Sequence, residues 1–282
     1  MASMCECLAQ QQISLRSRTR LLICATVMLC SAFTGACLPA AAEEPSLRVF
    51  CAGGFKPIAE ALAPLFKRAS GYELVVTYDA SGAIQTRLAE GQKADIIILN
   101  RARIGPKGVP GELPGSVTDV AISRSAIAVR AGAKAPDIST VTGFRKAMLD
   151  ARSVSYTDPA IGGSTGVLTV RIFERLGIAE AMKGKAVLAS QVAEGPGNLV
   201  AEGKAEIGIN QLSELAVIPG IQIVGPLPPE LDEPFVFAAS IQSDAREPKA
   251  AKAFIDFLGT PEALSAIRAG GMVPVTNSSR AR

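Results

Sequence analysis

Glycine and hydroxyl residues gather in four short turns, each placed between a predicted strand and a predicted helix. The turns are CAGGFKP (51–57), DASGAI (79–84), DPAIGGSTG (158–166) and EGPGN (194–198). Such turns present hydroxyls and backbone N–H groups at helix N-termini, where the macrodipole also favours negative charge. Four of them facing one crevice would bind an anion without any basic side chain. The alternative is that these residues are ordinary helix caps, each contributing about 0.5–2 kcal/mol.

The residues that are missing restrict the chemistry further. The chain contains no histidine, which excludes a Ser-His-Asp or Cys-His centre and any histidine-ligated metal. The stretch GGSTG (162–166) fits the G-x-S-x-G pattern of a hydrolase nucleophile, but the usual base is absent and no S-x-x-K occurs. There is also no phosphate-binding P-loop and no prominent pair of carboxylates. We therefore expect no catalytic residues, no metal ligands and no enzyme activity.

The first 42 residues are typical of a secretory signal peptide. Arg16, Arg18 and Arg20 precede an apolar run over 21–38, and Ala40 and Ala42 form an A-x-A cleavage site. The protein is thus predicted to be exported to the periplasm. Two alternatives remain open, a retained transmembrane anchor and a lipoprotein that is cleaved before Cys37.

Cysteine usage and charge agree with an exported protein that does not bind nucleic acid. Five of the six cysteines lie in the leader, so the mature chain keeps only Cys51 and has no internal disulfide. Without a histidine to activate it, Cys51 is interpreted as a buried apolar residue. Lys and Arg number 29 against 26 Asp and Glu, and the basic residues are scattered. No electrostatic footprint for nucleic acid is present.

After residue 46 the chain alternates short β-branched runs with segments of helical period. This pattern predicts an α/β fold with mostly parallel sheets flanked by helices. A Gly/Pro-rich loop over 105–115 interrupts it. Strands are expected at 47–53, 73–79, 94–100, 125–132, 185–190, 205–211, 221–225 and 235–241. The segment SVSYTDP (153–159) leads into the loop AIGGS (160–164). Helices are expected at 56–70, 81–90, 141–150, 165–177, 249–259 and 261–271.

Residues 47–100 resemble the start of the periplasmic molybdate-binding proteins of ABC transporters, which have the type II periplasmic binding fold. Two motifs carry the resemblance, V-x-x-x-[FY]-x-x-S-[GS] and G-x-x-A-D-[IVL]. The matching residues are Tyr78, Ser81 and Gly82 in the first motif and Gly91, Ala94, Asp95 and Ile96 in the second, while Val75 lies one residue closer to Tyr78 than the first motif has it. A looser likeness follows in TDPAIGGSTGVLTVRIFERLG (157–177) and GKAEIGI (203–209).

The resemblance implies two α/β lobes with a ligand in the cleft between them. Lobe 1 would comprise 43–123 and 238–282, and lobe 2 would comprise 124–237, with crossings near 123–127 and 233–237. The implied ligand is molybdate or tungstate, held by hydroxyls and backbone N–H groups. The implied partner is an ABC permease in the inner membrane, and the binding protein itself is expected to be a monomer. The positions that match the family's ligand contacts are Gly54, Ser81, Ser164, Thr165, Gly195 and Gln211.

Two of these positions depart from the family's pattern. The family usually has a serine where this chain has Gly54, and a tyrosine is commonest where it has Gln211. Because glutamine offers an acceptor as well as donors, a protonated or organic anion becomes conceivable. Ser81 is expected both to cap its helix and to donate to the ligand.

The sequence thus predicts an exported solute-binding protein that captures molybdate or a similar small oxyanion. Three alternatives stay open. The same fold could carry a different small anion, such as an organic acid or a phosphate-like ion. The chain could be an enzyme on a related fold, or a sensory or adhesion module that has lost transport.

Overall fold

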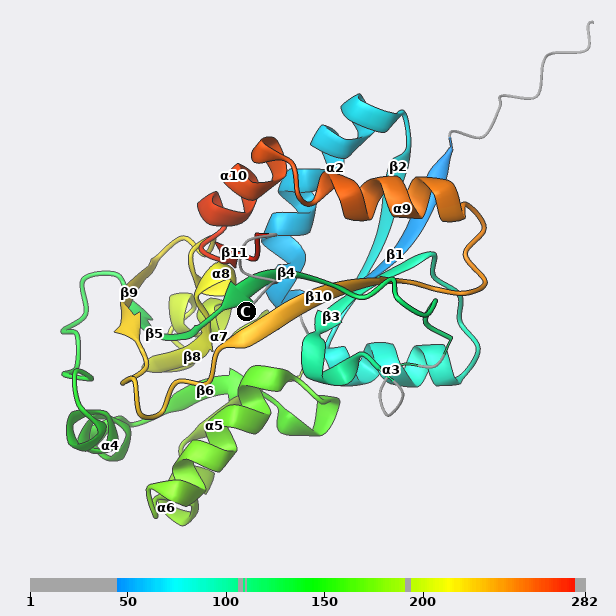
Figure 1. Ribbon diagram of the computed structural model, residues 1–282. Helices are drawn as coiled ribbons and strands as arrows, with labels where there is room; N and C mark the ends of the chain where they lie inside the picture. The colour runs from blue at the N-terminus through cyan, green and yellow to red at the C-terminus, as the bar shows by residue number, and fades with distance from the viewer. Residues whose placement is uncertain (1–44, 106–108, 110, 191–193, 277–282) are drawn as a thin grey trace, which may run out of the picture. The chain divides into compact units, whose positions relative to one another are not determined.

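The computed structural model describes residues 45–105, 109, 111–190 and 194–276. The predicted signal peptide (1–42), with its cleavage site and Cys37, lies outside the described residues, as does part of the 105–115 loop. The described chain forms two β-sheets with helices packed on them (Figure 1). None of the helices in these ranges is both long and apolar enough to cross a membrane.

The first sheet has six strands in the order β11-β4-β10-β3-β1-β2. They are β1 (Ser46–Ala52), β2 (Glu73–Asp79), β3 (Ile96–Asn100), β4 (Thr118–Ser123), β10 (Phe235–Ile241) and β11 (Val273–Pro274). Its helices are α2 (Lys56–Ser70), α3 (Ser81–Ala89), α9 (Pro248–Phe257) and α10 (Pro261–Ala269), with short 3₁₀ turns η1 (Gly53–Phe55) and η2 (Arg101–Arg103).

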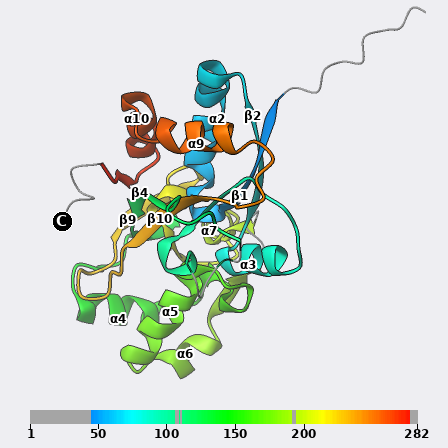
Figure 2. The same cartoon turned by 45° about the vertical axis from the view of Figure 1, so that its right-hand side comes forward.

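The central strand β3 shows why this sheet is covered on both faces. Its apolar run from Ile96 to Leu99 has no more than 1% exposure at any position. A strand without polar alternation must be buried on both sides. Helix α9 lies along one face and α3 along the other (Figures 1 and 2). Phe66 of α2 packs edge-on against Phe254 of α9, with ring centroids 5.0 Å apart.

The second sheet has five strands in the order β7-β6-β8-β5-β9. They are β5 (Ser125–Arg130), β6 (Val154–Thr157), β7 (Ala186–Ala189), β8 (Ile207–Gln211) and β9 (Ile221–Pro226). Its helices are α4 (Val141–Asp150), α5 (Ser164–Arg175), α6 (Ala179–Lys183), α7 (Pro196–Ala201) and α8 (Leu212–Leu215), with the 3₁₀ turn η3 (Pro159–Ile161). Tyr156 and Phe173 meet edge-on between β6 and α5.

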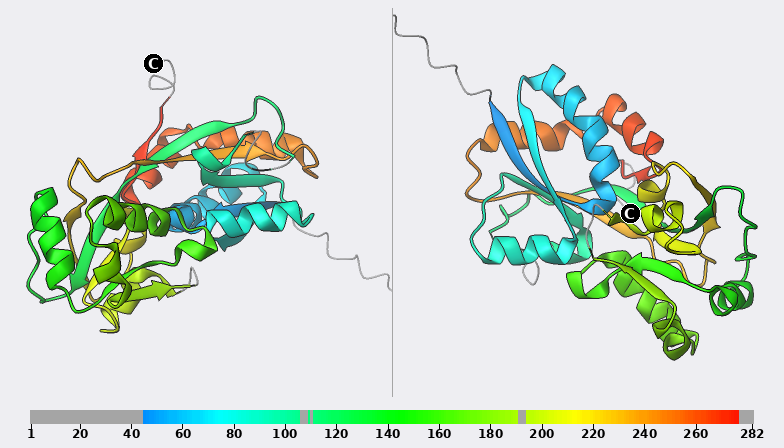
Figure 3. Two further views of the ribbon diagram at one scale, coloured as in Figure 1. Left: turned by 90° about the horizontal axis from the view of Figure 1, so that it is seen from below. Right: turned by 180° about the vertical axis from the view of Figure 1, so that it is seen from behind.

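The chain passes between the sheets twice, from β4 into β5 and from β9 into β10 (Figure 3). An ion pair between Arg124 and Asp232 joins the two connecting segments. The first sheet therefore takes its strands from 46–123 and 235–274, and the second from 125–226. The predicted lobe boundary at 237/238 falls inside β10, and the limits of the lobes stay a prediction.

The alternation of strands and helices predicted from the sequence is confirmed, and so is the two-lobed α/β class. The expectation of mostly parallel sheets needs a correction, because each sheet is mixed. β1 runs parallel to β2 and β3, whereas β10 runs antiparallel to β3 and β4. In the second sheet β6 runs parallel to β7 and β8, and β5 runs antiparallel to β8 and β9. The antiparallel strands β5 and β10 directly follow the two crossings, where no helix reverses the chain.

Candidate functional site

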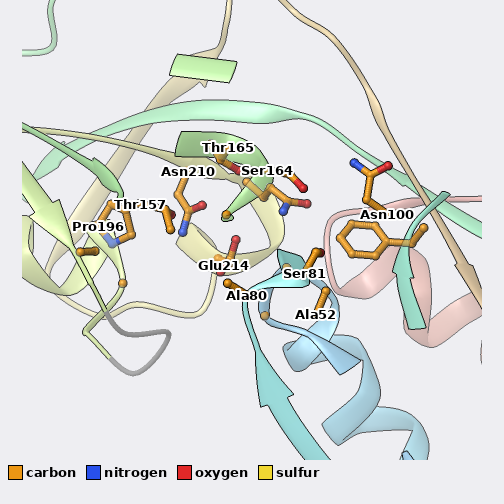
Figure 4. A pocket seen from close by; sticks show the side chains of 17 residues that line it. Ala52, Ala80, Ser81, Asn100, Thr157, Ser164, Thr165, Pro196, Asn210 and Glu214 are labelled. Atoms are coloured by element: carbon orange, nitrogen blue, oxygen red, sulfur yellow. The ribbon is translucent and has the colours of Figure 1, made fainter. Parts of the chain in front are cut away.

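A cavity lies at the carboxyl ends of strands from both sheets, the usual place for ligands in open α/β sheets (Figure 4). It leaves about 40 Å³ for the centres of water-sized groups, enough for a few small atoms. Its described lining is Ala52, Gly53, Gly54, Ala80, Ser81, Asn100, Thr157, Gly163, Ser164, Thr165, Ala189, Gly195, Pro196, Asn210, Gln211, Glu214 and Phe237. Glu214 is the only ionisable side chain among these residues.

All six residues predicted from the sequence line this one cavity. They are Gly54 in η1, Ser81 at the start of α3, Ser164 and Thr165 at the start of α5, Gly195 before α7, and Gln211 at the end of β8. Hydroxyls from both sheets, at Ser81 and at Ser164 and Thr165, therefore meet in one space. The arrangement offers neutral donors at helix N-termini, and whether these residues bind a ligand stays a prediction.

The expected capping role of Ser81 is wrong. The N-cap of α3 is Ala80, and Ser81 is the first helical residue. No side-chain hydrogen bond caps this helix end. Since the N-cap side chain is the one that can reach back to the orphan N–H groups, a serine one position later leaves its hydroxyl outside the cap. Ser81 is 5% exposed and lines the cavity.

The two departures from the family's pattern belong together in space. A Cβ placed on Gly54 would lie 2.2 Å from Nε2 of Gln211, far inside contact distance. The Gln211 side chain thus fills the space that a serine at position 54 would need. A buried hydrogen bond from Ser213 Oγ to the Gly54 carbonyl oxygen, 2.8 Å long, fixes the same loop against the second sheet.

The loops that carry Ser81 and Ser164 touch beside the cavity. The Gly82 amide donates to the Gly162 carbonyl oxygen at 3.3 Å, and Arg103 donates to the same oxygen at 3.2 Å. A Cβ on Gly82 would lie 2.8 Å from the Gly162 Cα. Gly162 also has φ of +73°, a conformation that other residues rarely adopt. Only glycines allow this approach of the two loops.

The sequence analysis missed several polar residues of the lining. Asn100 ends β3, Asn210 precedes Gln211 in β8, and Glu214 lies in the short helix α8. The signal that could have found the asparagines is a polar amide at the end of an otherwise apolar strand. For Glu214 the signal is an acidic residue directly after such a strand, in NQLSEL (210–215).

Glu214 is half-buried, and part of its surface faces the cavity. Burial, which penalises the charged carboxylate, raises its pKa to about 7. A hydrogen bond from the Asn210 side chain opposes this shift without cancelling it. The carboxyl can therefore either donate or accept a proton near neutral pH.

Two amide oxygens in the lining have no hydrogen-bond partner within the described chain. They are Oδ1 of Asn210 and Oε1 of Gln211, and the two residues are 2% and 5% exposed. Buried polar atoms are usually paired, so an unpaired acceptor at a cavity wall points to a partner that comes from outside the chain. The cavity thus combines donors with acceptors.

Other chemistry-bearing residues lie apart from this space. Cys51 is fully buried in the first sheet, and burial raises the pKa of its thiol far above the usual range, as expected for an apolar core residue. In the described part of the chain, no three His, Cys, Asp or Glu side chains come together as metal ligands would.

Comparison with known proteins places the chain in a family. The profile of the family described as bacterial extracellular solute-binding protein matches residues 47–273. The chain belongs to this family of solute-binding proteins. It is 33% identical over 246 residues to an aconitate isomerase from Pseudomonas sp., covering 84% of this chain and 92% of that protein. It is 27% identical to the molybdate-binding protein ModA of Rhodobacter capsulatus, with 85% and 92% covered.

A solved structure agrees with the fold of this solute-binding protein. The periplasmic molybdate-binding protein of Azotobacter vinelandii superimposes with a TM-score of 0.67 and 23% identity, covering 80% of this chain and 98% of that one. The predicted resemblance to the molybdate-binding proteins is thereby confirmed. The relatives carry two different names, one for a binding protein and one for an isomerase, so the ligand of this solute-binding protein has to be argued from its own cavity.

Proposed function

We propose that this protein captures a small organic carboxylate in the cavity between its sheets and delivers it to an ABC permease from the periplasm. The family supports an exported binding protein for a small solute. Hydroxyls and backbone N–H groups at the starts of α3 and α5 support an anionic ligand, since they supply donors without charge. Buried neutral dipoles also avoid leaving a charged side chain unpaired when the cleft is empty.

The single observation that favours an organic ligand over molybdate is Glu214. Its carboxyl shares the cavity with the donors, where a fully ionised dianion such as molybdate would meet a second negative charge. An organic acid can set its carboxylate against the donors and its carbon chain against Glu214. The Glu214 carboxyl then stays protonated more easily. The unpaired oxygens of Asn210 and Gln211 can accept a hydrogen bond from a hydroxyl or a protonated group of the ligand.

The test is a thermal shift measurement on the purified protein with molybdate, tungstate, sulfate, phosphate and a panel of mono-, di- and tricarboxylates. A ligand that binds only the folded state raises the melting temperature. We expect at least one carboxylate to raise it and molybdate and tungstate to leave it unchanged. Stabilisation by molybdate and tungstate alone would overturn the proposed ligand and restore the oxyanion predicted from the sequence.

Substitution of Thr165 tests the site, and substitution of Thr142 is its matched control. Its side chain is 3% exposed and lines the cavity, whereas Thr142 lies in α4 outside it. Thr165→Val removes one donor with little change of volume, and we expect it to weaken carboxylate binding about tenfold, the value of one hydrogen bond to a charged group. Thr142→Val should leave the affinity unchanged.

A second candidate function is isomerisation of an unsaturated polycarboxylate. The Glu214 carboxyl, poised near neutral pH in the cavity, favours it, together with the 33% identical aconitate isomerase. Ionised Glu214 would take a proton from a CH₂ carbon beside the double bond. The electron pair would shift along the allylic system, and the same proton would return to the far carbon. No atom is gained or lost, and no cofactor is required.

Proton NMR in D₂O tests this activity directly with cis- and trans-aconitate. Interconversion of the two by the wild-type protein, abolished in Glu214→Gln, would support the isomerase function. If both compounds bind and neither changes nor exchanges its CH₂ hydrogens, the protein only binds. The Gln variant keeps the shape of the side chain, so a melting curve shows whether it has folded.

A further inference from the structure

We infer that a second cavity beyond Glu214 is a subsite for a second anionic group of the ligand, with Lys56 as its counter-charge. The ligand class is therefore an organic anion with two carboxylate groups joined by a carbon chain. This inference rests on the proposed function and extends it from a carboxylate to a dicarboxylate.

The second cavity adjoins the first and is the larger of the two. It measures about 190 Å³ and shares four lining residues with the first cavity, Gly53, Gly195, Asn210 and Glu214. Glu214 and Asn210 thus stand at the boundary between the two spaces. A ligand that fills only the donor-lined cavity leaves the second one empty, while a longer ligand reaches both.

Lys56 gives the second cavity a positive charge that the described lining of the first cavity lacks. It is the first residue of α2, where a cation is disfavoured by the helix dipole. Its Nζ lies 3.8 Å from Glu60 Oε1, which is beyond hydrogen-bond distance, and both side chains are about half exposed. The ammonium group also lies over the Tyr78 ring, 5.5 Å from its centroid. Both contacts are weak, so a carboxylate in the cavity can compete for Lys56.

The remaining walls suit the carbon chain between two carboxylates. Pro57, Val217 and Ile218 present apolar surface to the second cavity. Asn210, which is 2% exposed and lines both cavities, keeps Oδ1 without a partner in the described chain. A buried unpaired acceptor in a cavity that Lys56 also lines indicates a polar ligand, because an apolar one would leave this oxygen unsatisfied.

Calorimetric titration with succinate, trans-aconitate and butyrate tests the subsite. Butyrate has the four-carbon chain of succinate but one carboxylate. In the wild type we expect succinate or trans-aconitate to bind at least about tenfold more tightly than butyrate, the value of one additional charged hydrogen bond. In Lys56→Gln that advantage should disappear, with butyrate affinity unchanged.

The matched control is Lys249→Gln, which removes the same charge from the exposed start of α9, outside both cavities. It should leave all affinities unchanged. If butyrate binds as tightly as the dicarboxylates, or if Lys56→Gln weakens butyrate and the dicarboxylates equally, the subsite is refuted while the proposed function stands. If no carboxylate binds at all, both proposals fail.

Discussion

Two carboxyl groups of this protein, Asp95 and Glu214, have opposite surroundings. Asp95 precedes β3 of the first sheet, with a fully buried side chain. One of its oxygens accepts from the Arg48 amide and Nε, at 2.8 and 3.1 Å, and the other accepts from Arg48 Nη2 and the Arg246 amide, both at 2.8 Å. Burial alone would raise its pKa, but these donors outweigh it and lower the pKa to about 2.

Glu214 belongs to the second sheet's side of the cavity and has no cation among its hydrogen-bond partners in the described chain. Burial dominates, and the pKa rises to about 7. Asp95 is satisfied by its own chain and holds β1 to β3. Glu214 and the nearby amide oxygens lack a complete set of hydrogen-bond partners and line a cavity. The difference teaches that a complete set of partners marks a structural carboxyl, whereas an incomplete set marks one that faces a ligand.

Removing Asp95 should give the largest effect. Asp95→Ala leaves the Arg48 guanidinium and two backbone N–H groups without their acceptor, so we expect a loss of about 3–5 kcal/mol in the free energy of unfolding. Urea denaturation at pH 7 measures it. Asp150→Ala, at an exposed ion pair with Lys146, should change stability by less than about 0.5 kcal/mol. A loss below about 1 kcal/mol for Asp95→Ala would contradict the structural role.

The same comparison predicts the acid behaviour of Asp95. Because its folded-state pKa is lowered, its contribution to stability is present above the unfolded value near 3.8 and is lost as the pH falls toward about 2. Asp95→Asn should therefore flatten the fall of stability over this range, measured by denaturation at a series of pH values. An unchanged acid profile in Asp95→Asn would show that Arg48 does not control the titration.

The contact between the cavity loops should have the next largest effect. Gly82→Ala places a Cβ 2.8 Å from the Gly162 Cα and separates the loops that carry Ser81 and Ser164. Overpacking of this kind costs about 1–3 kcal/mol, so ligand affinity should fall about 5- to 150-fold by calorimetry. Gly184→Ala, where a Cβ meets nothing within 4 Å, is the control. Equal ligand affinities for the two variants would show that binding does not require contact between the Ser81 and Ser164 loops.

Restoring the family's serine should work only if Gln211 is removed. Gly54→Ser forces the new side chain into Gln211, with an expected destabilisation of about 1–2 kcal/mol. In a Gln211→Ala background the same substitution should be nearly neutral. The double-mutant cycle, measured by urea denaturation, should give a coupling of about 1 kcal/mol. Additive effects would mean that the side chains at positions 54 and 211 do not interact.

The smallest expected effect is the pH dependence caused by Glu214. Its folded-state pKa is raised, so its contribution to stability is complete below the unfolded value near 4.5 and is lost as the pH rises through about 7. The other ionisable groups lining the adjoining cavity are Lys56 and Glu60. Glu214→Gln should remove a stability change of about 1 kcal/mol between pH 5 and 8, reduced from the full shift because the cavities admit solvent. If the pH dependence of stability in Glu214→Gln equals that of the wild type, the Glu214 carboxyl is not its source.

Much of the first sheet could be predicted because its elements are local and regular. The apolar run before Asn100 and the Pro57 to Gly71 helix carry their own boundary signals. Strands β4 and β11 and the short helices α6 and α8 were missed, since two to six residues give too little periodicity to read. The antiparallel direction of β10 depends on where the chain recrosses, which local sequence does not specify.

The positions of the candidate site's residues were predicted from the sequence, but its electrostatics were not. The resemblance to the molybdate-binding proteins implied that Ser81, Ser164 and Thr165 share one site, and they line one cavity. The clash between a residue at 54 and Gln211 joins segments about 160 positions apart and follows only from the fold. The raised pKa of Glu214 likewise depends on desolvation by both sheets, which no sequence window contains.

Proton uptake on binding tests the central claim most directly. Calorimetric titration of the protein with trans-aconitate, and separately with molybdate, is run at pH 7 in two buffers of different ionisation enthalpy. An anion placed beside Glu214 should complete its protonation, so we predict uptake of about half a proton per trans-aconitate bound, and none in Glu214→Gln. Binding of molybdate with no proton exchange, and no binding of trans-aconitate, would contradict the account.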